Sequence, residues 1–122
     1  MHELPVTITL FVLDVSQKTR LKSFLAIPGQ GDAIRRSSVI GEQAGDVQKI
    51  LNEVQVALEK NNVSATPELS EKLKVASSDL LIQLFLIGFQ YGYDFDELFD
   101  LGLARLDEFK HTNYAGLEIR AE

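Results

Sequence analysis

Residues 80–89 read Leu80-Leu81-Ile82-Gln83-Leu84-Phe85-Leu86-Ile87-Gly88-Phe89, and this stretch decides the fold. Drawn as a helix, it turns apolar side chains almost all the way round its axis. Such a helix is enclosed on most sides, whereas a helix in a monomeric bundle keeps one face in water. We therefore expect an all-α domain that pairs with a copy of itself, so that the second chain covers the remaining apolar face.

Three polar residues lie along one side of this apolar helix. Asp79, Gln83 and Gln90 are separated by 4 and 7 residues, so they share a narrow stripe. Burial of such groups without partners costs on the order of 1–3 kcal/mol each. One interpretation is a polar seam that lines a ligand site. The other is structural, with Asp79 near an exposed helix end, where it caps the helix or pairs with Lys72 or Lys74.

Capping residues mark where this helix and the following one begin and end. Thr66-Pro67-Glu68 combines a capping residue, a proline in the first turn and an acid near the positive helix end, which predicts a start. Gly92 is expected to end the helix in a left-handed turn. Asp94 then caps the next helix, with Glu97 as in a capping box, and this helix reaches about Lys110. Its inward-facing residues are expected to be Leu98, Leu101 and Leu106.

An amphipathic helix is predicted from Ala33 to about Lys60, with Asp32 as its cap. Its apolar face is expected to carry Val39, Ile40, Val47, Ile50, Leu51, Val54 and Leu58. The stripe at the edge of that face and beyond consists of Glu42, Asp46, Lys49 and Glu53.

The first 29 residues have a mixed pattern. Residues 7–12 are rich in β-branched side chains that also suit a strand. Leu10, Leu13, Leu21, Phe24 and Leu25 nevertheless keep a helical spacing, so we expect an N-terminal helix within residues 1–29. With a polar tail over residues 111–122, the prediction is a single domain, residues 1–122, folded as a four-helix bundle.

Composition excludes several classes of function. The chain of 122 residues has no cysteine, so disulfides, thiolate metal sites and cysteine catalysis are excluded. A net charge of −6 argues against binding to a nucleic acid backbone. The apolar run of residues 80–89 is too short to span a bilayer, and no signal peptide pattern precedes it. We expect a soluble cytoplasmic protein without a membrane partner.

Two parts of the chain follow the layout of a known family. Residues 41–50 read Gly-Glu-Gln-Ala-Gly-Asp-Val-Gln-Lys-Ile. Further on, Ser78–Leu84 leads through the apolar helix to the turn Gly92–Glu97. From roughly residue 30 to residue 110, the order of these motifs resembles that of the MazG-like, all-α nucleoside triphosphate pyrophosphohydrolases. The resemblance implies a helical bundle that assembles as a dimer or tetramer. It also implies four acids on two facing helices that bind Mg²⁺, and hydrolysis of a nucleotide to its monophosphate and pyrophosphate.

Transferred position by position, the resemblance implies a reduced metal site. Two of the four acid positions fall on Asp46 and Asp79, and the other two fall on Gln43 and Ala76. Magnesium commonly uses one or two carboxylates together with substrate phosphates. The implied Mg²⁺ ligands are therefore Asp46, Asp79 and the amide oxygen of Gln43, and no catalytic residue is assigned.

Other residues are candidates for contact with the nucleotide. Gln83 lies deeper in the polar seam, and Arg35 and Arg36 form a local basic patch that suits phosphates. The alternative for the two arginines is ordinary solvated helix charge. A lysine and an asparagine that many family members carry on the last helix are replaced by Gly102 and Leu106.

These observations leave two hypotheses. The first is a MazG-like nucleotide-binding protein that, if it is still active, is a Mg²⁺-dependent nucleoside triphosphate pyrophosphohydrolase with an altered metal site. The second is a catalytically inactive helical dimer that acts as a binding or regulatory module. The retained Asp46 and Asp79 favour the first, and the two missing acids favour the second.

Overall fold

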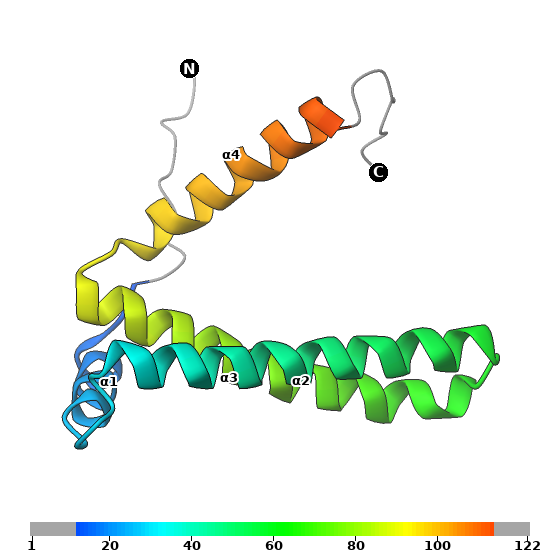
Figure 1. Ribbon diagram of the computed structural model, residues 1–122, viewed down its shortest axis with the longest axis horizontal. Coiled ribbons are helices and arrows are strands. Elements are labelled where there is room, and N and C mark those ends of the chain that lie inside the picture. Colours follow the sequence, from blue (N-terminus) through cyan, green and yellow to red (C-terminus); the bar gives the residue numbers. More distant parts are fainter. Residues whose placement is uncertain (1–11, 114–122) are drawn as a thin grey trace, which may run out of the picture. The chain divides into compact units, whose positions relative to one another are not determined.

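The computed structural model describes residues 12–113, and these residues are almost entirely helical (Figure 1). The helices are α1 (Val15–Leu25), α2 (Ala33–Glu59), α3 (Thr66–Tyr91) and α4 (Phe95–Asn113), with a short 3₁₀ helix η1 (Val63–Ala65) before α3. No strand occurs between residues 12 and 113. The prediction of an all-α chain with four helices is thus confirmed. Residues 1–11 of the segment predicted to hold the N-terminal helix and residues 114–122 of the tail lie outside the described range.

Capping side chains set the start of the first two helices. Asp14 Oδ1 accepts from the Gln17 backbone N–H (2.7 Å), and Gln17 Oε1 accepts from the Asp14 N–H (3.0 Å), which forms a capping box. The helix predicted within residues 1–29 therefore begins at Val15 in this part of the chain. Asp32 caps α2 as predicted, because its carboxylate accepts from the Ile34 N–H (2.9 Å).

The C-terminal end of α3 agrees with the prediction, and its N-terminal end differs from it. Gly92 follows Tyr91 with a φ of 74°, the left-handed conformation expected of a C-terminal glycine. The start is different, since Thr66 is the first helical residue and not the cap. Ala65 precedes it without a side-chain hydrogen bond, because η1 leads directly into α3 and leaves no extended position for a capping side chain.

The chain divides into two compact units, residues 14–92 and a second unit whose described part is mainly α4. In α4, Asp94 Oδ1 accepts from the Asp96 N–H (2.9 Å), and the helix continues three residues beyond the predicted Lys110. No residue of α4 is buried. The predicted inward packing of its leucines stays a prediction, because α4 belongs to the second unit. Leu98, Leu101 and Leu106 are 41%, 55% and 65% exposed.

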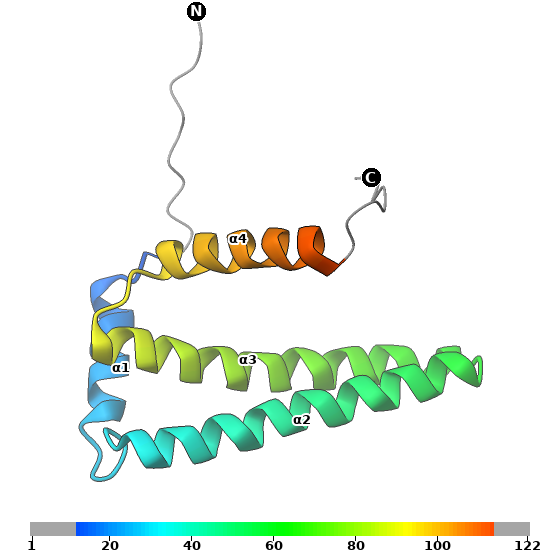
Figure 2. The ribbon, with the colours of Figure 1, turned by 45° about the horizontal axis from the view of Figure 1, so that its top comes forward.

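Helices α2 and α3 run side by side in opposite directions and form a hairpin, as both views show (Figures 1 and 2). Most of their buried and half-buried residues form a series with alternating steps of four and three, the spacing of a coiled-coil seam. On α2 these are residues 36, 40, 43, 47, 50, 54 and 57, and on α3 residues 69, 73, 76, 80, 83 and 87. Leu51 and Leu58 were expected on this face, but they lie outside the seam and are 50% and 58% exposed.

Helix α1 packs at the end of the hairpin where α3 finishes (Figure 2). Leu21 is the buried residue of α1, and Leu86 of α3 is 3% exposed. The last turns of α3 are therefore covered on more than one face, which agrees with the apolar character of residues 80–89. Leu81, Ile82 and Leu84 nevertheless remain 52%, 46% and 48% exposed, and their cover by a second chain stays a prediction.

The stretch Val63–Tyr91 is long and apolar enough to cross a membrane, by length and composition only. Its most apolar part has a mean hydropathy of 1.3, and 22% of that part is buried in the structure. The core helix of a soluble protein can meet the same criteria of length and composition, so this is weak evidence for a membrane span. The expected cytoplasmic location therefore stays a prediction.

Candidate functional site

An open groove of about 530 Å³ lies along the α2–α3 hairpin and brings together the two retained motif acids. Asp46 comes from α2 and Asp79 from α3. The other lining residues are Lys49, Ile50 and Glu53 of α2 and Glu68, Glu71, Lys72, Val75 and Ala76 of α3. Asp46, Lys49 and Glu53 of the stripe that the sequence places at the edge of the apolar face of α2 thus lie along one wall of this groove, and Glu42 does not.

The groove carries five carboxylates and two lysines, and the lysines and acids of α3 pair locally. Lys72 Nζ lies 3.6 Å from the Glu68 carboxylate, and Lys74 Nζ lies 3.7 Å from that of Glu71. Neither lysine pairs with Asp79, so the structural interpretation of Asp79 as a partner of these lysines does not describe this arrangement. Asp79 is exposed, and like Asp46 it makes no ion pair within residues 12–113.

The number of carboxylates in the groove limits the way in which a metal ion could bind there. In the described part of the chain, no three acids or histidines lie close enough to hold an ion by themselves. Two aspartates on facing helices do suit a Mg²⁺ ion that arrives with phosphate ligands, because Mg²⁺ keeps waters and needs few protein carboxylates. The predicted binding of Mg²⁺ by Asp46 and Asp79 therefore stays a prediction, and it would need ligands from phosphate as well as from protein.

Gln43, the third predicted metal ligand, does not line this groove. It is half-buried in the α2–α3 seam, and its Oε1 is buried without a hydrogen-bond partner within residues 12–113. The amide oxygen thus belongs to the helix interface. The prediction that it binds Mg²⁺ would require its side chain to turn out of the seam.

Arg36 and Gln83, both predicted to contact a nucleotide, are instead in contact with each other. Arg36 is 4% exposed and Gln83 is 8% exposed, and Arg36 Nη1 donates a hydrogen bond to Gln83 Oε1. Arg36 Nη2 donates to the carbonyl and side-chain oxygens of Gln30, and the guanidinium lies 5.5 Å from the ring centroid of Phe24. Contact with a nucleotide would require this buried cluster to open, so that contact stays a prediction.

Arg35 has a different position from its neighbour. It is exposed, and it lies over the loop before α2, since a Cβ on Gly29 would come within 3.3 Å of Arg35 Nε. Gly29 has a φ of 88°, so the loop uses the left-handed conformation that glycine adopts readily. Arg35 and Asp46 are separated by about 16 Å along α2, at 1.5 Å per residue. The predicted site residues therefore form two groups, one at the groove and one near the start of α2.

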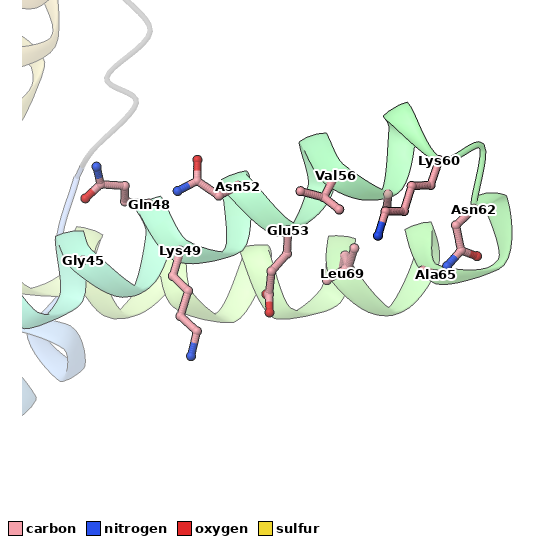
Figure 3. A pocket seen from close by; sticks show the side chains of 11 residues that line it. Gly45, Gln48, Lys49, Asn52, Glu53, Val56, Lys60, Asn62, Ala65 and Leu69 are labelled. Carbon is pink, nitrogen blue, oxygen red and sulfur yellow. The ribbon is translucent and has the colours of Figure 1, made fainter.

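A second open groove, of about 690 Å³, lies nearer the turn of the hairpin. Figure 3 shows Lys49 and Glu53 on one side of α2, with Gln48 and Asn52 on the other. Lys49 and Glu53 line both grooves, so a charged rim is common to the two. The apolar part of this second groove consists of Val56, Ala57, Ala65 and Leu69.

Glu68, Glu71 and Lys72, which line the Asp46–Asp79 groove from α3, were not predicted as site residues. Glu68, Lys72 and Asp79 are spaced by four and seven residues, the spacing of one helix face. That periodicity was available in the sequence. It did not indicate a site, because an i,i+4 charge pair on an exposed helix face is ordinary.

Comparison of the chain with protein-family models, with curated proteins and with solved structures finds no match in any of the three.

Proposed function

We propose that this protein is a MazG-like nucleotide-binding protein that holds the Mg²⁺-bound phosphates of a nucleotide in the Asp46–Asp79 groove. The observation that supports the proposal most is that these two acids, one on each helix of the hairpin, line the same groove. Both occupy acid positions of the motifs that the chain resembles, and neither is used in an ion pair within residues 12–113.

In the proposed complex, Asp46 and Asp79 are the protein ligands of the magnesium ion. Bound magnesium neutralises phosphate charge and orients or activates an attacking water. Lys49 lies in the same groove and supplies a positive charge that attracts phosphate oxygens. Hydrolysis to a monophosphate and pyrophosphate is the reaction proposed for this site if the two acids suffice for turnover.

A thermal-shift screen against the common nucleoside triphosphates, each with and without Mg²⁺, tests the binding. A ligand that binds the native state raises its stability by about 2.7 kcal/mol at a concentration of 100 Kd. We expect a Mg²⁺-dependent rise in Tm with at least one nucleotide, followed by pyrophosphate release from that nucleotide. The absence of any Mg²⁺-dependent shift across the panel would contradict the proposal.

The second candidate function is a catalytically inactive helical dimer that serves as a binding or regulatory module. It is favoured by the exposed leucine and isoleucine side chains on α3 and by the uncharged residues at two motif acid positions, Gln43 and Ala76. Under this hypothesis the protein is a stable dimer in solution and shows no Mg²⁺-dependent shift with any nucleotide. The same screen therefore separates the two functions.

A further inference from the structure

Helix α3 is turned in a way that apolar burial does not explain. Gln83 is 8% exposed, whereas Ile82 and Leu84 on either side of it are 46% and 48% exposed. A rotation of one residue about the helix axis would cover a leucine or isoleucine in the seam and expose the amide. Residues 80–89 are apolar almost all the way round, so hydrophobic packing leaves the rotation of this second half of α3 open, whereas Leu69, Leu73 and Ala76 already place one face of the first half in the seam.

A polar contact selects the observed rotation. Gln83 Oε1 accepts from Arg36 Nη1, and the other partners of the Arg36 guanidinium are Gln30 and the face of Phe24. Within residues 12–113 no carboxylate pairs with Arg36, so its buried charge depends on these neutral groups. A leucine in place of Gln83 would leave Nη1 without its acceptor, and this opposes the rotations that hydrophobicity permits.

A second hydrogen bond, made by Gln90 on the same stripe of α3, favours the same rotation of the helix. Gln90 Nε2 donates to the Gly31 carbonyl (2.9 Å), in the loop that also carries Gln30. Gln83 and Gln90 are seven residues apart, hence on one face of α3, and Asp79 lies on that face one turn before Gln83. Fixing the two amides therefore also fixes the direction in which Asp79 points.

We propose that Arg36 and Gln83 are positioning residues, whose buried hydrogen bond holds the second half of α3 in its observed rotation and so directs Asp79 into the groove that Asp46 lines. The inference rests on the proposed function for its consequence in binding, although the rotation itself does not depend on any ligand. A polar residue within an otherwise apolar helix interface has this effect in coiled coils, where it specifies register at a cost in stability.

The rotation of α3 can be measured as the distance between a label on α2 and a label on α3. The chain has no cysteine, so the double change Asp46→Cys/Asp79→Cys provides two unique labelling sites for spin labels. A rotation of one residue would move the label on α3 by roughly 8 Å, because a helix with its side chains is about 10–12 Å across. The distance is measured by pulsed electron paramagnetic resonance, with excess unlabelled protein present so that only distances within one chain are read.

We expect a single narrow distance distribution in the otherwise unchanged chain and in Gln83→Glu, which keeps an acceptor for Arg36. Gln83→Leu and the double variant Arg36→Leu/Gln83→Leu are expected to give a shifted or broadened distribution. The double variant removes both members of the polar pair, so that no buried charge is left without a partner, and it is expected to fold. Gln55→Leu is the matched control, since Gln55 is exposed and bonds only to Glu59 on its own helix (3.2 Å).

With Asp46 and Asp79 intact, Gln83→Leu and the double variant are also expected to bind Mg²⁺ with ATP roughly 10–100-fold more weakly, the usual effect of losing a group that orients a metal ligand. An unchanged distance distribution in both variants would overturn the inference, whatever the binding shows. If the unsubstituted protein binds no Mg²⁺–nucleotide, the proposed function fails while the distance measurement still decides the role of Arg36 and Gln83.

Discussion

Asp46 of α2 and Asp79 of α3 line one open groove, and neither carboxylate is used in an ion pair within residues 12–113. Two free acids on facing helices concentrate negative charge in the groove. These carboxylates repel phosphate unless a bound cation offsets their charge. Lys49 contributes to that balance from the same wall of the groove.

Restoring the missing motif acids is expected to make the stability of the protein depend on Mg²⁺. In Gln43→Glu/Ala76→Glu, two carboxylates are added at a half-buried and a buried position close to Asp46 and Asp79 in sequence. Without metal their repulsion and desolvation should lower the Tm, and Mg²⁺ should restore it. Differential scanning calorimetry with and without Mg²⁺ measures this. Gln55→Glu adds an exposed acid elsewhere on α2 and should show no Mg²⁺ effect. Equal responses of the two variants to Mg²⁺ would count against the groove as a metal site.

The exposed face of α3 is expected to be the dimer interface. Leu81 and Leu84 are each about half exposed, so their cover should contribute about 1 kcal/mol per side chain, counted twice in a symmetric dimer. Leu81→Lys/Leu84→Lys should therefore weaken dimerisation roughly 100-fold or more, as read by sedimentation equilibrium. Val63→Lys, at a 78% exposed position of η1, is the control and should leave the dimer intact. A dimer of unchanged affinity in the leucine variant would place the interface elsewhere.

The C-terminal turn of α3 is expected to need glycine. At Gly92 the φ of 74° costs a residue with a side chain about 1–2 kcal/mol, although a Cβ there would meet no atom within 4 Å. Gly92→Ala should therefore lower the free energy of unfolding in urea by about that amount. Gly41→Ala, inside α2 and equally free of contacts, should instead raise it by about 0.5–1 kcal/mol. Destabilisation of similar size by both changes would show that backbone conformation is not the cause.

Local patterns in the sequence were sufficient to predict most of the helices. Asp32 and Gly92 act within one turn of the helix ends that they set, so α2 and the end of α3 could be predicted closely. Thr66 was wrongly predicted as a cap, because η1 brings a helical turn directly before it and removes the extended conformation that capping needs. The inward packing of the α4 leucines stays a prediction, because periodicity identifies an apolar face but not what covers it.

The candidate site could be predicted in part. The spacing of Asp79, Gln83 and Gln90 correctly indicates one polar stripe, since it depends only on helix geometry. The partners of that stripe could not be predicted, because Arg36 and Gly31 are far away in sequence and meet it only when α2 and α3 form the hairpin. Whether Arg36 is a solvated charge or a buried one depends on the same long-range packing.

Isothermal titration calorimetry measures directly whether Asp46 and Asp79 hold a Mg²⁺-bound nucleotide. ATP, and any nucleotide that the screen selects, is titrated in Mg²⁺ buffer into the unsubstituted protein and into Asp46→Asn, Asp79→Asn and Glu42→Gln. Each Asn variant keeps the shape of the side chain and removes one carboxylate charge. Glu42 lies on α2 outside the groove and is exposed, so its change is the matched control. We predict Mg²⁺-dependent binding to the unsubstituted protein and to Glu42→Gln, and at least roughly tenfold weaker binding to both Asn variants. Binding of equal strength in all four proteins would contradict the assignment of the phosphate–metal site to Asp46 and Asp79.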